Sequence, residues 1–226
     1  MSGKRNKTRI IEAIVGLVMI LSVLSMLFAF LMNFDYTVPD ATIEEDVDFM
    51  ADSISRQKLS AISWLVAGAI NLFLLPFYLI LFQRFQKGMH IFNAFLLLGM
   101  AFCFFRLGLT ILNIAEFSSN YPELRIEEGE IPTEVLVAIR QVLQLSKIGI
   151  TFFGAFSTVF TISRFSEVKF PVVGSTLAFL AGPVVITFIW LNPEHVLLTA
   201  SLAVGWTGLL MIGLRLANKG LELKQV

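Results

Sequence analysis

Six long runs of apolar residues constrain this chain more than any other feature. A hydrocarbon core about 30 Å thick is crossed by roughly 20 residues of α-helix, and the runs reach or nearly reach that length: 10–32, 59–82, 91–115, 144–163, 171–191 and 196–214. Backbone polar groups in lipid must pair within the protein, which an α-helix does by itself. The sequence therefore predicts an all-α, polytopic membrane protein: a single six-transmembrane-helix bundle over residues 1–226.

The composition excludes several classes of protein. Hydrophobic residues make up 56% of the chain and charged residues 15%, whereas a soluble domain has roughly 45–50% and about 25%. An ordinary cytosolic enzyme is therefore excluded. Seventeen basic residues balance seventeen acidic ones, so the uniformly basic surface that nucleic-acid binding needs is missing. The single cysteine, Cys103, allows neither an intrachain disulfide nor a cysteine metal cluster.

The first apolar run could be mistaken for a signal peptide, because four basic residues precede it: Lys4, Arg5, Lys7 and Arg9. Its apolar stretch is too long for a signal peptide, and it ends in Asn33-Phe34-Asp35 with no small-residue cleavage pattern. We therefore interpret it as a retained span.

The basic residues predict the orientation. Besides the four at the N-terminus, basic residues lie at three places. Arg84 and Lys87 lie between the second and third runs, Arg164 and Lys169 lie between the fourth and fifth runs, and Arg215, Lys219 and Lys224 follow the sixth run. Basic residues are retained on the cytoplasmic side, so both termini are predicted to be cytoplasmic. The outer segments, 33–58 and 116–143, are then rich in acidic residues, which contribute little to orientation.

Two features are expected outside the spans. Thr42 and Glu45 fit a helix capping box, and apolar residues then recur at helical spacing, so a short outer amphipathic helix is predicted: Ile43, Val47, Met50 and Ile54. A helix from about Thr133 to Arg164 is longer than a bilayer requires, and its first three turns should project outside. The inner connections, 83–90 and 164–170, are short.

Motifs for known chemistry are missing. The two histidines, His90 and His195, are expected at opposite membrane faces, so they cannot ligate one metal or haem. The metalloprotease, serine hydrolase and nucleotide-binding patterns are absent from the sequence. We therefore expect no catalytic residues, no metal and no cofactor, and a protein that is not an enzyme. The acidic outer residues are interpreted as a solvated surface rather than a calcium site.

The positive signal is charge within the apolar runs. Arg106 interrupts the third run and Lys147 lies in the fourth. Counting along the helices places them roughly 22 Å and about 25 Å from the inner boundary. Each cation belongs to a polar stripe at i, i+4, i+7 spacing, and Asn71 with Ser60 and Ser63 adds a polar face on the second helix. The candidate ligand-binding residues are Arg106, Lys147, Thr110, Asn113, Gln144, Arg140 and Asn71.

These stripes predict an outward-facing polar pocket. A charge at the bilayer centre costs about 2.5 to 3.5 kcal/mol on insertion scales, so such residues usually face the bundle interior or a wet cavity. We expect a binding or sensing module for a small or lipidic anion. The structural alternative is that Arg106 and Lys147 snorkel to the interface, or pair with Glu116 and other acidic residues.

Two further functions remain open. An accessory or assembly subunit would have a membrane-protein partner besides the lipid bilayer. A small-solute transporter would need a continuous polar path, but the fifth and sixth runs lack charge and the inner halves of the spans are nearly uniformly apolar.

Short motifs resemble a widespread bacterial family of six-span membrane proteins known only as a domain of unknown function. They are Lys7-Thr8-Arg9-Ile10, Phe77-Tyr78-Leu79-Ile80-Leu81 and Phe105-Arg106-Leu107. The resemblance implies a six-helix fold in a bacterial cell (inner) membrane and no assigned activity. It carries over one residue, Arg106, as an intramembrane arginine of undetermined role. The acidic outer segment and the long fourth helix depart from the family's usual pattern.

Overall fold

The chain folds into long helices that match the predicted spans. The computed structural model describes residues 2–32, 54–82, 87–120, 133–165, 172–193 and 195–221. The helices in these ranges are α1 (Ser2–Met32), α3 (Ile54–Phe82), α4 (Lys87–Asn120), α5 (Thr133–Phe165), α6 (Val172–Leu191) and α7 (Val196–Leu221). All six are long and apolar enough to cross a membrane. The prediction of six long apolar helices, each able to span a membrane, is thus confirmed for the described residues.

The boundaries differ from the prediction at the ends of the spans. Helix α4 begins at Lys87, so His90 belongs to a helix and not to the inner connection. Helix α5 runs without interruption from Thr133 to Phe165, close to the range predicted for the long fourth helix. The predicted outer amphipathic helix lies outside the described residues, except for Ile54, which opens α3.

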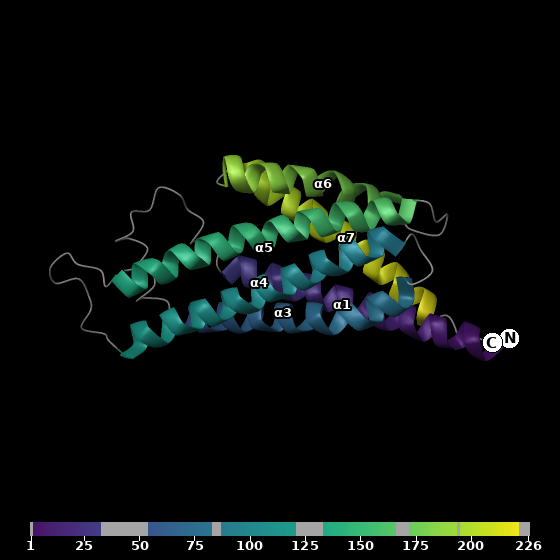
Figure 1. Cartoon of the computed structure of the whole chain (residues 1–226), viewed down its shortest axis with the longest axis horizontal. Helices are drawn as coiled ribbons and strands as arrows, with labels where there is room; N and C mark the ends of the chain where they lie inside the picture. Colours follow the sequence, from purple (N-terminus) through teal and green to yellow (C-terminus); the bar gives the residue numbers. More distant parts are fainter. Residues whose placement is uncertain are drawn as a thin grey trace.

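The helices form a closed ring. Each packs against the next along the chain, and α7 returns to pack against α1. Figure 1 shows the long helices side by side, with both chain termini at one end of the bundle. We call the opposite end the distal end. Short connections make sequential helices neighbours, and the ring gives each helix one side toward the common core and one side outward.

The two sides of each helix are both apolar. The core contains buried side chains from every helix, such as Val15, Leu97 and Phe160. The outward sides carry large exposed apolar side chains, including Phe102, which is 68% exposed, and Leu180, which is 57% exposed. A soluble protein rarely exposes so much apolar surface, and a surrounding lipid phase accounts for it.

Glycines allow several helix pairs to approach closely. A Cβ atom added to Gly208 of α7 would lie 2.6 Å from Gly174 O and 2.7 Å from Ala178 N of α6. On the other side of α6, Gly182 faces Gly154 of α5 at similarly short range. Small residues that bring backbones together are the usual means of helix packing in membranes, and here they hold α6 between α5 and α7.

Candidate functional site

Helices α4 and α5 bring the two candidate cations to the same level. A Cβ atom added to Gly149 of α5 would lie 2.8 Å from Phe104 Cε1 of α4. Farther toward the distal end, Ile114 of α4 packs in one cluster with Ile139 of α5. Helices α4 and α5 run antiparallel, so a later residue on α4 lies level with an earlier residue on α5. Arg106, two residues after Phe104, therefore lies level with Lys147, two residues before Gly149.

The same register sets Asn113 level with Arg140. Asn113, Arg140 and Gln144 are exposed, as is Arg106, whereas Lys147 is half-buried. Among the described residues, Arg106, Arg140 and Lys147 form no ion pair, and the pairing of Arg106 with exposed Glu116 considered from the sequence is not seen there. These polar side chains therefore lie on the surface of the helix pair.

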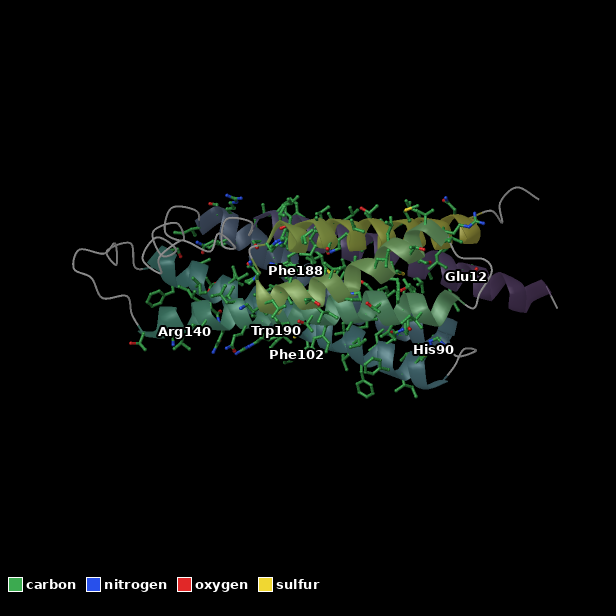
Figure 2. All side chains as sticks on the ribbon, turned by 90° about the horizontal axis from the view of Figure 1, so that it is seen from above. Glu12, His90, Phe102, Arg140, Phe188 and Trp190 are labelled. Carbon is green, nitrogen blue, oxygen red and sulfur yellow. The ribbon has the colours of Figure 1, made fainter. Side chains whose placement is uncertain are left out.

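The end of α6 explains why this part of α5 is polar. The indole Nε1 of Trp190 donates a hydrogen bond of 2.9 Å to Thr151 Oγ1, and Thr151 Oγ1 donates one of 2.7 Å to Lys147 O. Lys147 thus lies one turn, about 6 Å, beyond the last turn of α6. Gln144 and Arg140 follow on the same side of α5. Figure 2 shows Arg140 nearer the distal end than Trp190.

The outward side of α4 changes character at the same level. Exposed residues up to Phe105 are apolar, among them Phe95, Phe102 and Phe105 itself. Beyond them the exposed side chains include Arg106 and Asn113. Tryptophan is enriched where apolar membrane surface ends, and Trp190 of α6 is 56% exposed. Exposed apolar side chains continue farther toward the distal end, at Leu143 and Val137 of α5, so Arg106 and Lys147 lie within the distal half of the apolar surface, where the count along the sequence placed them.

We call this polar surface, beyond the end of α6, the distal step. It consists of Arg106, Asn113, Arg140, Gln144 and Lys147. It offers cationic groups and amide groups over about two turns of each helix, roughly 10 Å, next to exposed apolar side chains. Such a surface can bind an anion whose other part is apolar.

Two predicted site residues lie apart from the distal step. Thr110 is buried, and its hydroxyl donates a 2.9 Å hydrogen bond to Arg106 O of its own helix. Asn71 is 1% exposed. Its Nδ2 donates to Ala67 O over 2.8 Å, and its Oδ1 accepts a 2.9 Å hydrogen bond from Ser22 Oγ of α1. The structure thus uses Asn71 to join α3 to α1.

A buried polar seam runs along α3 and was missed as a unit. Gln57, Trp64, Asn71 and Tyr78 are all buried and recur every seven residues. A seven-residue period keeps side chains on one side of a helix. The seam carries hydrogen-bonding side chains over about 32 Å of helix, counted at about 1.5 Å per residue. The seven-residue period is visible in the sequence, but of these four residues the predicted polar face includes only Asn71, together with Ser60 and Ser63.

The seam ends in a polar cluster near the chain termini. The Tyr78 ring lies 6.4 Å from the His90 ring and 6.2 Å from the Phe160 ring, between centroids. One turn along α4, Asn93 is fully buried, and its Oδ1 and Nδ2 have no hydrogen-bond partner among the described residues. Figure 2 shows His90 toward the end that holds the termini. The interior there is therefore less apolar than the sequence indicated, because α4 begins earlier and buries His90.

The described part of the chain offers no candidate site for metal binding or for thiol chemistry. Within those residues, no three His, Cys, Asp or Glu side chains gather as ligands. Cys103 is a free thiol buried in α4. The exposed cations of the distal step are thus the charged groups best placed to meet a ligand.

Comparison of the chain with protein-family models, with curated proteins and with solved structures found no match in any of the three. The resemblance to a bacterial six-span family stays a prediction from short motifs. The functional argument therefore depends on the geometry of the chain itself.

Proposed function

We propose that this protein is a non-enzymatic, multi-pass protein of a bacterial inner membrane, with both termini in the cytoplasm, that binds the anionic headgroup of a lipid at the distal step. The observation that carries the proposal is the level placement of Arg106 and Lys147, exposed or half-exposed and without an ion pair among the described residues. With the termini inside, the distal step meets the outer leaflet.

The chemistry of the step suits a phosphate. An arginine presents a planar fork of donors that matches phosphate oxygens, and a lysine adds a mobile positive charge. Arg106 and Lys147 lie in the distal half of the apolar surface, and their long side chains can extend from there toward the level of the lipid phosphates. The amide groups of Asn113 and Gln144 add hydrogen-bonding capacity at the same surface.

A lipid is favoured over a small soluble anion because the step is a surface with apolar neighbours. Phe102 and Phe105 of α4 and Ile148 of α5 are exposed just below the cations, at 68%, 46% and 38%. These side chains would contact acyl chains while the cations contact the headgroup. A small anion would gain nothing from them.

The experiment is a lipid titration of the purified protein in a mild detergent, followed by native mass spectrometry. Phosphatidylglycerol is compared with phosphatidylcholine for the wild type, for Arg106→Gln with Lys147→Gln, and for a control, Arg215→Gln, at the other end of the bundle. A cation near a lipid surface contributes about 1 kcal/mol. The double variant should therefore bind phosphatidylglycerol about 30-fold more weakly.

The control variant should keep the wild-type affinity. Equal phosphatidylglycerol binding by the double variant and the wild type would refute the proposal, as would an equal loss in Arg215→Gln. The melting temperature reports folding in each sample. Because the step residues are exposed and unpaired among the described residues, their replacement should change stability by less than about 0.5 kcal/mol.

Small-solute transport is the second candidate, and the buried polar seam of α3 favours it. Asn71 provides a polar group inside the bundle, and Tyr78 provides one toward the end that holds the termini, where the sequence suggested nearly only apolar groups. Flux through proteoliposomes that falls in Asn71→Leu but not in Asn113→Leu would support this function. The mass spectra also test the accessory-subunit alternative, which requires a co-purified membrane protein.

A further inference from the structure

A groove of about 550 Å³ opens on the outward side of the bundle, between α1 and α3. Along α1 it extends from Leu21 to Leu31, and along α3 from Ile62 to Ile70. It lies in the distal half of both helices and on a different side of the ring from the distal step. Leu21 and Leu31 are more than half exposed, at 54% and 53%, so the groove faces the surrounding lipid.

Two small side chains make room for the groove. Ser25 of α1 and Ser63 of α3 are its two hydroxyl residues, and its other lining residues are apolar. Ser25 Oγ donates to Ser22 O over 3.2 Å, and Ser63 Oγ donates to Leu59 O over 2.9 Å. Both hydroxyl protons are thus held by their own helices. The groove therefore presents an apolar lining to an occupant.

The two ends of the groove differ. Its inner end lies beside the hydrogen bond between Ser22 Oγ and Asn71 Oδ1, which holds α1 and α3 together. At its distal end, Arg56 of α3 reaches across, and its Nη2 donates to Leu31 O over 3.5 Å. Leu31 is itself a lining residue. The groove is apolar along its length and has a guanidinium at its mouth. It therefore matches a lipid, which has an apolar tail and a charged head.

The dimensions favour an acyl chain over a helix. Ten residues of α1 rise about 15 Å, which is about half of the roughly 30 Å hydrocarbon core and therefore the depth of one leaflet. A volume of 550 Å³ spread over that length has a cross-section of about 37 Å². A helix about 10 Å across has a cross-section of about 80 Å², so a helix cannot enter the groove.

We propose that this groove binds one phospholipid of the leaflet at the distal end, with an acyl chain along the groove and the headgroup phosphate on Arg56. The guanidinium is a permanent cation with five N–H donors, so it can contact a phosphate in addition to its protein partners. Lys58, two residues after Arg56 on α3 and half-exposed, adds positive charge near the mouth. This site is independent of the proposed function, because it uses other helices and other cations.

The test places a bulky side chain at the exposed edge of the groove, so that the side chain occupies the space of the lipid. Val66 lines the groove and is 43% exposed, so Val66→Trp should add bulk to the groove without burying a misfit in the core. Leu72→Trp is the matched control, on the same helix, 53% exposed and outside the lining. Each protein is titrated with phosphatidylglycerol and with phosphatidylcholine in detergent, and bound lipids are counted by native mass spectrometry.

The wild type and Leu72→Trp should retain one lipid that Val66→Trp binds at least tenfold more weakly, whichever headgroup is used. Arg56→Gln should weaken the binding of phosphatidylglycerol about fivefold, the equivalent of about 1 kcal/mol for one cation. It should weaken the binding of phosphatidylcholine less. The double variant of Arg106 and Lys147 should keep this lipid, which separates the two sites.

Three results would overturn the proposal. In the first, Val66→Trp binds the same number of lipids with the same affinities as the wild type, which includes the case where detergent alone fills the groove. In the second, the wild type is a dimer that Val66→Trp dissociates, so a second copy covers the groove. In the third, Leu72→Trp loses the same lipid. If Val66→Trp unfolds, Ile62→Trp at the same groove, 50% exposed, replaces it.

Discussion

Trp190 donates its indole Nε1–H to Thr151 Oγ1 over 2.9 Å, and this bond fixes the last turn of α6 on α5, one turn from Lys147. Beyond it α5 continues without α6 beside it. The polar stripe of α5 is therefore explained by the length of a neighbouring helix. Lys147, in the distal half of the apolar surface, is therefore half-exposed and not covered by α6.

The orientation of the bundle can be tested through its single cysteine. Cys103 is buried in α4, so Cys103→Ala gives a background on which Thr133→Cys or Asn218→Cys adds one exposed thiol at either end. A membrane-impermeant maleimide applied to intact cells should label Thr133→Cys and leave Asn218→Cys unlabelled. After the membrane is permeabilised, both should react.

The reverse labelling pattern in intact cells would place the termini outside and would move the distal step to the cytoplasmic leaflet. The unmodified protein is the control. Its buried thiol should remain unlabelled in both conditions.

The hydrogen bond between Ser22 and Asn71 predicts a coupling between α1 and α3. Both residues are buried, and Ser22 Oγ donates to Asn71 Oδ1 over 2.9 Å. Interhelical hydrogen bonds in membrane proteins contribute about 0.6 kcal/mol on average. A double-mutant cycle of Ser22→Ala and Asn71→Ala, measured by reversible unfolding in mixed micelles, should give a coupling free energy of that size.

Asn71→Ala alone should lower the free energy of unfolding more than Ser22→Ala does, because it also opens a cavity and removes the hydrogen bond to Ala67 O. Additive effects of the two substitutions would show that this hydrogen bond does not stabilise the bundle.

Glycine packing between α6 and α7 predicts a sharp difference between two positions on one helix. A Cβ atom at Gly208 would meet Gly174 O at 2.6 Å, whereas at Gly205 its nearest neighbour would be Ala181 Cβ at 3.3 Å. Gly208→Ala should therefore lower the free energy of unfolding by about 1–3 kcal/mol through overpacking. Gly205→Ala should lower it much less. Equal melting temperatures for the two variants would contradict this packing.

The buried amide of Asn93 predicts a substitution that stabilises. Neither Oδ1 nor Nδ2 of Asn93 has a hydrogen-bond partner among the described residues, and the residue is fully buried. An unpaired buried amide costs about 1–3 kcal/mol. Asn93→Leu should therefore raise the melting temperature, and Asn113→Leu, at an exposed position of the same helix, should hardly change it.

A lower melting temperature for Asn93→Leu would mean that the amide has a stabilising partner, such as internal water. Such a result would also strengthen the transport candidate, because the polar cluster at the end of the seam would then be hydrated.

The prediction of six helices from the sequence succeeded because hydropathy is a local property. A run of about 20 apolar residues favours a membrane-spanning helix whatever lies beside it. The level placement of Arg106 and Lys147 also followed from counting along two helices, and the contact between Gly149 and Phe104 agrees with it. Thr110 and Asn71 do not join the other five residues, because both are buried: Thr110 bonds to Arg106 O of its own helix, and Asn71 bonds to Ser22 of α1.

The sequence by itself determined the number and order of the six long apolar helices in the described part of the chain, since these depend on residues adjacent along the chain. The tertiary structure decided how each helix is rotated about its axis, and with it the partner of Asn71, the burial of His90 and the groove between α1 and α3. In a soluble helix, one apolar side shows which way the helix faces. In this bundle both sides are apolar, so the pattern of one helix does not encode its rotation, and only packing against the neighbouring helices sets it.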